Sequence, residues 1–161
     1  MSDKVEVGLI GCGLMGSQHA RNLVEIEGAN LRALADVNLD AAKRLKQEAG
    51  GKYCTPNPQD LFNDAKIDLI LICTHHHLHL PFAIQAAEAD KDIFVEKPLA
   101  LTIKECEQIE STVKHMGVKL MVGFQARFSP FMKKLKQSVP NPLVIVGQMV
   151  DPRWGDDSWA N

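Results

Sequence analysis

The chain has 161 residues, enough for one domain with a buried core and little more. Its formal net charge of −2 gives no basic surface of the kind that binds nucleic acid or an anionic membrane. No apolar run approaches the ~20 residues of a membrane-spanning helix. The four cysteines are scattered without a C-x-x-C spacing, which indicates reduced thiols. We therefore expect a cytoplasmic protein without a signal peptide, a membrane span or a nucleic-acid partner.

The first predicted elements are a strand over Val5–Ile10 and a helix over 14–27, joined by glycines in the spacing G-x-G-x-x-G. Gly11 permits a tight turn, Gly13 lets a pyrophosphate approach the backbone, and Gly16 lets the helix pack close to the strand. The amino end of the helix offers N–H groups and partial positive charge to phosphates. These features indicate a dinucleotide-binding loop. His19 in this helix is expected to be a partly buried structural residue.

The next predicted strand, over 31–36, ends in a carboxylate that lies twenty residues after the last glycine. A dinucleotide fold places there the acid that binds the adenine ribose. The alternative is an ordinary strand–turn–helix connection with incidental glycines, but the complete order of elements favours the dinucleotide site. Asp36 would bond both ribose hydroxyls of NAD and repel a 2′-phosphate, and Val37 and Asn38 supply no arginine to offset that repulsion. The expected cofactor is NAD, with NADP less favoured.

Further elements alternate between strand and helix with short connections. We expect helices over 40–49, 59–64 and 80–89, a helix from its cap at Thr102 to Met116, and strands over 52–54, 66–73, 92–95 and 119–123. Thr102 and Glu105 form a capping box. The alternation predicts an α/β fold with a doubly wound parallel sheet of the Rossmann type, whose ligands bind at the carboxyl ends of the strands.

The character of the sequence changes after Phe124. We expect a loop over 125–130, a short basic helix over 131–138 and a strand over 143–150. The predicted organisation is a dinucleotide-binding domain over 1–124, followed over 125–161 by a linker and the first strand of an incomplete second α/β domain. The truncation would leave the last strand to fray or to pair with another chain, and we expect a homo-oligomer.

Several separated motifs occur together in a fixed order: Gly11-x-Gly13-x-x-Gly16, Asp36, a Cys73-Thr74 turn ending at His79, Glu96-Lys97-Pro98-Leu99, and Gly123-Phe124-x-x-Arg127-Phe128. Together they resemble the Gfo/Idh/MocA oxidoreductases, the group of glucose–fructose oxidoreductase and inositol dehydrogenase. The resemblance implies an NAD(P)-dependent dehydrogenase of a small-molecule sugar or polyol. It implies that Lys97 is the catalytic lysine at the substrate hydroxyl or carbonyl, that Glu96 orients Lys97 or binds the nicotinamide ribose, and that Pro98 adopts a cis bond.

The candidate cofactor-binding residues follow from the motifs and the resemblance together. They are Gly11, Cys12, Gly13, Leu14, Met15, Gly16, Asp36, Cys73, Thr74, His76, His79, Glu96, Lys97 and Gln125. The run of histidines from His75 to His79 could alternatively suggest a metal. No carboxylate or cysteine is spaced to complete such a site, so no metal is expected.

Two functions remain open from the sequence. The first is a dehydrogenase, favoured by Lys97 within Glu-Lys-Pro. The resemblance also implies that a second half supplies an Asp and a His for catalysis, and no segment of this chain matches them, so the 161-residue chain itself is expected to be inactive. The alternative is a non-catalytic dinucleotide-binding module.

Overall fold

The computed structural model describes residues 4–141. They form two compact units, which divide between Phe124 and Gln125.

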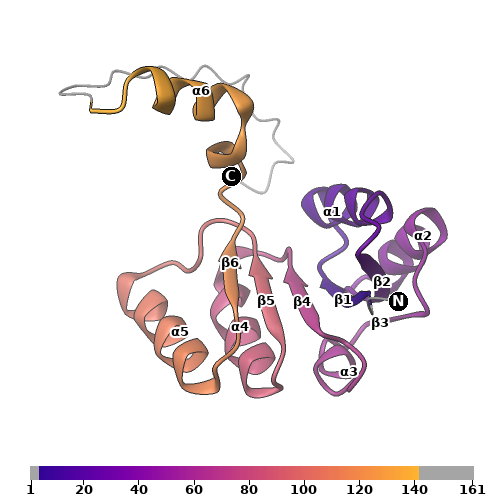
Figure 1. Ribbon diagram of the computed structural model, residues 1–161. Helices are drawn as coiled ribbons and strands as arrows, with labels where there is room; N and C mark the ends of the chain where they lie inside the picture. Colours follow the sequence, from indigo (N-terminus) through magenta and orange to yellow (C-terminus); the bar gives the residue numbers. More distant parts are fainter. Residues whose placement is uncertain (1–3, 142–161) are drawn as a thin grey trace, which may run out of the picture. The chain divides into compact units, whose positions relative to one another are not determined.

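The first unit is built on one six-stranded sheet in which every neighbouring pair of strands is parallel. The strands are β1 (Val5–Ile10), β2 (Ala29–Ala35), β3 (Tyr53–Thr55), β4 (Leu69–Ile72), β5 (Asp92–Val95) and β6 (Leu120–Val122). Their order across the sheet is β3-β2-β1-β4-β5-β6, so the direction of winding reverses between β1 and β4 (Figure 1). A doubly wound sheet binds its ligand at such a reversal, and the predicted Rossmann fold is confirmed.

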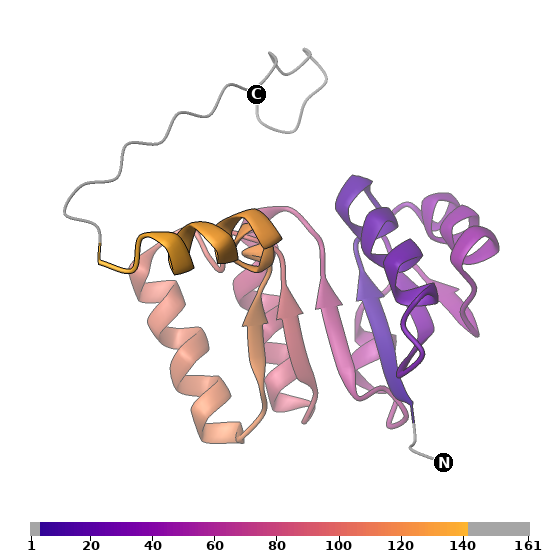
Figure 2. The same cartoon turned by 45° about the horizontal axis from the view of Figure 1, so that its top comes forward.

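Helices cover both faces of this sheet (Figure 2). They are α1 (Leu14–Val24), α2 (Leu39–Ala49), α3 (Gln59–Phe62), α4 (His79–Glu88) and α5 (Ile103–Met116), with a 3-10 turn, η1 (His76–Leu78), before α4. One apolar cluster packs the sheet against α1 and α2, and the other packs it against α3, α4 and α5. Within β4, Ile70 and Ile72 enter the second cluster and Leu71 the first. This alternation explains the nearly continuous apolar run, because both faces of the strand are buried.

Local chemistry sets several element boundaries. Thr102 and Glu105 form the predicted capping box at the start of α5, and Gly117 ends that helix in the left-handed region with φ of 74°. Asn38 caps α2 by accepting bonds from the amides of residues 40 and 41. β2 begins two residues before the expected start and stops at Ala35, so Asp36 lies just beyond the strand.

The second unit contains two helical segments within the described residues. The predicted loop after Phe124 is wrong, because Gln125–Phe128 forms a 3-10 turn, η2. α6 (Pro130–Ser138) follows, and the Ser129 hydroxyl caps it by accepting a bond from the amide of Met132. The proline fits the first turn because its missing N–H has no intrahelical partner there. The predicted strand over 143–150 lies outside the described residues. Between residues 4 and 141, no helix is both long and apolar enough to cross a membrane.

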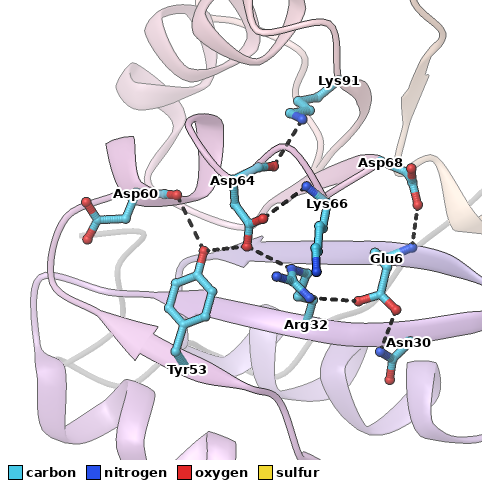
Figure 3. A network of polar contacts seen from close by, with 9 residues as sticks. All are labelled: Glu6, Asn30, Arg32, Tyr53, Asp60, Asp64, Lys66, Asp68 and Lys91. Carbon is cyan, nitrogen blue, oxygen red and sulfur yellow. Dashed lines mark hydrogen bonds and ion pairs between the residues drawn. The ribbon is translucent and has the colours of Figure 1, made fainter.

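A polar network joins the strands near their amino ends (Figure 3). The Arg32 guanidinium lies between the carboxylates of Asp64, at 2.7 Å, and Glu6, at 3.7 Å. Tyr53 donates its hydroxyl to Asp64 at 3.1 Å. Burial opposes ionisation of Asp64, but the bonds from Arg32, the Lys66 amide and Tyr53 outweigh it and lower the pKa of Asp64. The network therefore supplies hydrogen-bond and charge partners to the largely buried Arg32 side chain, at the end of the sheet away from the glycine loop.

Candidate functional site

The glycine loop is shaped by two close backbone contacts that only glycine allows, one at Gly11 and one at Gly16. Gly11 has φ of 95°, and a Cβ atom on it would lie 2.4 Å from the carbonyl oxygen of Cys73. A Cβ atom on Gly16 would lie 1.8 Å from the carbonyl oxygen of Gly11, so α1 packs directly on the loop. No heavy atom of the described residues lies within 4 Å of a Cβ atom built on Gly13. The loop is closely packed at its two ends and open at its centre, as an approaching pyrophosphate requires.

The amino end of α1 faces this open centre. No side chain of the described residues caps the helix at Gly13, and its first turn contains no acidic residue. Leu14 and Met15 provide the first backbone amides of the helix, and such uncapped N–H groups attract anions. The loop and helix end together fit the phosphates of a dinucleotide.

Asp36 lies beside the glycine loop, immediately after β2. Its Oδ2 accepts a bond from the amide of Cys12 at 2.7 Å, and its Oδ1 accepts one from the amide of Asn38 at 2.8 Å. The neighbouring Val37 is exposed. The carboxylate is therefore fixed at the position where the sequence predicts a ribose-binding acid.

The thiols that line the loop are unreactive. Burial, with the nearby Asp36 carboxylate and Cys54, raises the pKa of Cys12 to about 12. Burial and the Glu96 carboxylate also raise the pKa of Cys73. Both thiols stay protonated at neutral pH, so they act as small packing groups and not as nucleophiles.

His79 lies between the loops that follow β4 and β5. Its ring is fully buried, with Nδ1 2.7 Å from the carbonyl oxygen of Pro98 and Nε2 3.1 Å from that of Thr74. Both ring nitrogens face main-chain oxygens, so the side chain is engaged within the protein, and a cofactor contact of His79 through its backbone stays a prediction. The residue joins the loops that follow β4 and β5.

The other histidines of this run lie nearer the surface. His75 and His77 are exposed and stack on each other, with ring centroids 6.0 Å apart. His76 is half-buried, and burial together with nearby His79 and Lys97 lowers its pKa, so the neutral ring is favoured. Over residues 4–141 no three His, Cys, Asp or Glu side chains are grouped as metal ligands.

Lys97 follows β5 at the same edge of the sheet. Its side chain is exposed, and the bond between Lys97 and Pro98 is cis, as the resemblance implied. Glu96 is only 6% exposed, and its Oε2 accepts a bond from the backbone amide of Lys97 at 3.2 Å. Of the two roles expected for Glu96, this contact supports the orientation of Lys97 through its backbone.

His19 is a residue of this site that the sequence analysis missed. It is partly buried in α1, as expected, but its Nε2 also lies 2.7 Å from Oε1 of Glu96. The two residues are 77 positions apart, so no local pattern could have paired them. The only available signal was the place of His19 one turn after Gly16. Gln125 begins η2 in the second unit, and its cofactor contact stays a prediction.

Residues 5–124 match a protein-family model described as an oxidoreductase family with an NAD-binding Rossmann fold. The chain belongs to the Gfo/Idh/MocA oxidoreductase family. This confirms the resemblance inferred from the motifs. The matched range contains the glycine loop, Asp36 and Lys97.

Characterised relatives in this family include inositol dehydrogenases. The chain is 35% identical over 140 residues to myo-inositol 2-dehydrogenase of Thermotoga maritima, covering 87% of this chain and 42% of the relative. It is 35% identical over 140 residues to the NAD-dependent scyllo-inositol 2-dehydrogenase of Bacillus subtilis, covering 86% and 41%. The chain thus spans about two fifths of the length of these relatives.

A solved structure shows the same architecture. The scyllo-inositol dehydrogenase of Lactobacillus casei, with bound NAD(H) and scyllo-inositol, superposes with a TM-score of 0.81 at 28% identity. The match covers 86% of this chain and 41% of that protein.

Proposed function

We propose that residues 1–124 bind NAD and form the cofactor domain of a dehydrogenase that acts on a polyol or sugar, with inositols as the first candidate substrates. Residues 125–161 would then be the linker and first strand of the substrate domain. The observation that carries this proposal is the gathering of the glycine loop, Asp36 and Lys97 at one edge of the sheet. Family membership and the inositol dehydrogenases among the relatives support the substrate class.

The proposed chemistry divides among this chain's own residues. The amides at the start of α1 hold the pyrophosphate, and Asp36 accepts bonds from the adenine ribose. NAD, when bound, supplies the acceptor for the hydride of the substrate carbon. Nζ of Lys97 accepts the proton of the substrate hydroxyl during oxidation and returns it to the carbonyl oxygen during reduction. Glu96 holds the Lys97 backbone by accepting a bond from its amide. His76 is a further proposed cofactor contact within the first unit.

Nucleotide binding is the direct test of this proposal. NADH and NADPH fluorescence titrations compare the wild-type chain with Asp36→Ala. Asp40→Ala is the matched control, because Asp40 is an exposed acid in the first turn of α2. We expect NADH to bind more tightly than NADPH, and Asp36→Ala alone to weaken NADH about tenfold, the effect of ~1.4 kcal/mol in binding. Absence of NADH binding by the wild-type chain would contradict the proposal.

Turnover is tested separately from binding. The chain is assayed for NADH formation with NAD and myo-inositol or scyllo-inositol, with Lys97→Ala as the control. We expect little or no turnover by the 161-residue chain. NADH formation that Lys97→Ala leaves unchanged would argue against the assigned role of the lysine. Cytoplasmic location and assembly into a homo-oligomer stay predictions from the sequence.

A further inference from the structure

The two residues that flank Lys97 are each held by a histidine, and the two histidines come from different helices. His19 of α1 contacts the side chain of Glu96, and His79 at the start of α4 contacts the carbonyl oxygen of Pro98. Both helices begin at the predicted cofactor edge of the sheet. The segment from residue 96 to residue 98 is thus held from two sides.

The first contact joins α1 to Glu96, which in turn accepts a bond from the backbone amide of Lys97. The side chain of Glu96 is 8% exposed, and burial of a charge without hydrogen bonds is costly. Its Oε1 receives the His19 ring at 2.7 Å and its Oε2 receives the Lys97 amide at 3.2 Å. The His19 ring also packs on the Phe94 ring in a T-shaped arrangement, with centroids 5.3 Å apart. Movement of His19 would therefore release the carboxylate that fixes the Lys97 amide.

The second contact joins two loops that are distant in sequence. The His79 ring lies between the carbonyl oxygens of Thr74, after β4, and Pro98, after β5, at 3.1 and 2.7 Å. A neutral ring donates a hydrogen bond to one of these two oxygens and packs against the other. Because the ring is fully buried, water does not compete for either contact. The ring fixes the distance between the segment that carries Lys97 and the loop beside the glycine motif.

This arrangement matters because the Lys97 side chain is itself exposed. A lysine stem is long and flexible, so its ammonium reaches one place reproducibly only if the backbone is fixed. We propose that His19 and His79 are positioning residues that fix the backbone of Lys97, and that His19 ties it to the helix of the cofactor loop. The functional meaning of this positioning rests on the role proposed for Lys97.

The proposal is tested by amide hydrogen exchange of the ¹⁵N-labelled chain, measured by NMR. We compare His19→Leu, His79→Leu, and His19→Gln, whose side-chain amide replaces the Nε2 donor. His115→Leu is the control, since His115 is exposed in the last turn of α5. His19→Leu should speed exchange of the Lys97 amide about tenfold, as expected for loss of a charge-assisted hydrogen bond to Glu96. His79→Leu should also speed it, because the neighbouring Pro98 carbonyl oxygen loses its contact. His19→Gln and His115→Leu should stay close to wild type.

Exchange of the Ile70 amide in β4 separates positioning from general destabilisation. Fast Lys97 exchange with unchanged Ile70 protection supports the proposal. Unchanged exchange of the Lys97 amide in the leucine variants overturns it. Equal acceleration of the Lys97 and Ile70 amides in His19→Gln also overturns it. Should a leucine variant fail to fold, the Nε2 proton of His19 is measured in the wild-type chain instead. A proton on Nε2 that is protected from exchange supports the contact with Glu96, and an unprotonated Nε2 overturns it. None of these measurements needs nucleotide, so a failure of NADH binding would count against the proposed function alone.

Discussion

The carboxylate of Asp36 accepts a hydrogen bond from the backbone amide of Cys12 at 2.7 Å. The acid at the end of β2 is therefore tied to the glycine loop as well as being placed for the ribose. Its other oxygen accepts the amide of Asn38. One side chain thus holds the loop geometry and, in the proposed function, also binds the ribose of the cofactor.

Asp36→Asn separates these two roles. The amide side chain keeps an oxygen that can accept the Cys12 bond but loses the negative charge. We expect NADH binding to weaken about tenfold, or ~1.4 kcal/mol, and NADPH to gain relative to NADH because repulsion of its 2′-phosphate is removed. Fluorescence titration measures the affinity of each variant for NADH and for NADPH. An unchanged NADH-to-NADPH ratio would show that the charge of Asp36 does not select the cofactor.

Gly13→Ala and Gly16→Ala should differ in their effect on folding. At Gly13 a Cβ atom meets no heavy atom of the described residues within 4 Å, so stability should be nearly unchanged while the methyl group blocks the pyrophosphate. At Gly16 the Cβ atom lies 1.8 Å from the Gly11 carbonyl oxygen, so α1 must move. We expect Gly16→Ala to lower the unfolding free energy by about 1–3 kcal/mol and both variants to lose NADH binding.

Urea unfolding and NADH titration of the same samples check this pair. Gly28→Ala is the matched control, because a Cβ atom there also meets no described heavy atom within 4 Å and the residue lies away from the loop. NADH binding by Gly13→Ala at wild-type affinity would exclude close approach of the pyrophosphate at that position.

Gly123→Ala should disturb Lys97 through the carboxylate of Glu96. A Cβ atom on Gly123 would lie 3.1 Å from Oε1 of Glu96, the oxygen that contacts His19. The carboxylate must shift by a few tenths of an ångström, which weakens its bonds to His19 and to the Lys97 amide. We expect severalfold faster exchange of the Lys97 amide with Ile70 protection unchanged. Identical Lys97 exchange in this variant would show that Glu96 adapts without losing either contact.

Tyr53 gives the network of Figure 3 a measurable pH dependence. Burial first, and then its bond to Asp64, raises the pKa of Tyr53 to about 12. Because the pKa of an unfolded tyrosine is about 10, the folded state holds this proton more strongly, and stability is lost as pH rises from there toward 12. The stability advantage of wild type over Tyr53→Phe should therefore shrink across this range.

The sequence contains a single tyrosine, so phenolate absorbance reports Tyr53 alone. Titration of the folded chain should give a midpoint near 12, and the same titration in urea one near 10. Coincident midpoints in the two titrations would mean that the hydroxyl is neither buried nor held by Asp64 in solution.

Local chemistry in the sequence determined most of the fold. The bounds of β1 and β5 are as predicted, because alternating or continuous apolar residues stop at glycine or polar positions. The capping box at Thr102 was readable because its partners are three residues apart. The glycine spacing and Asp36 also predicted the cofactor edge, since each motif carries its own local geometric requirement. The turn at η2 was missed because its residues carry no regular helical pattern.

Only the tertiary structure decided which side chains support Lys97. The fold buries the His79 ring between the carbonyl oxygens of Thr74 and Pro98, a contact that no local pattern indicated. It also brings His19 to Glu96 across 77 residues. Parallel strands return the chain to the same edge of the sheet after each helix, so contacts there join residues that are distant in sequence. A local pattern specifies an element and its ends, whereas the partners of a buried polar group depend on how the elements pack.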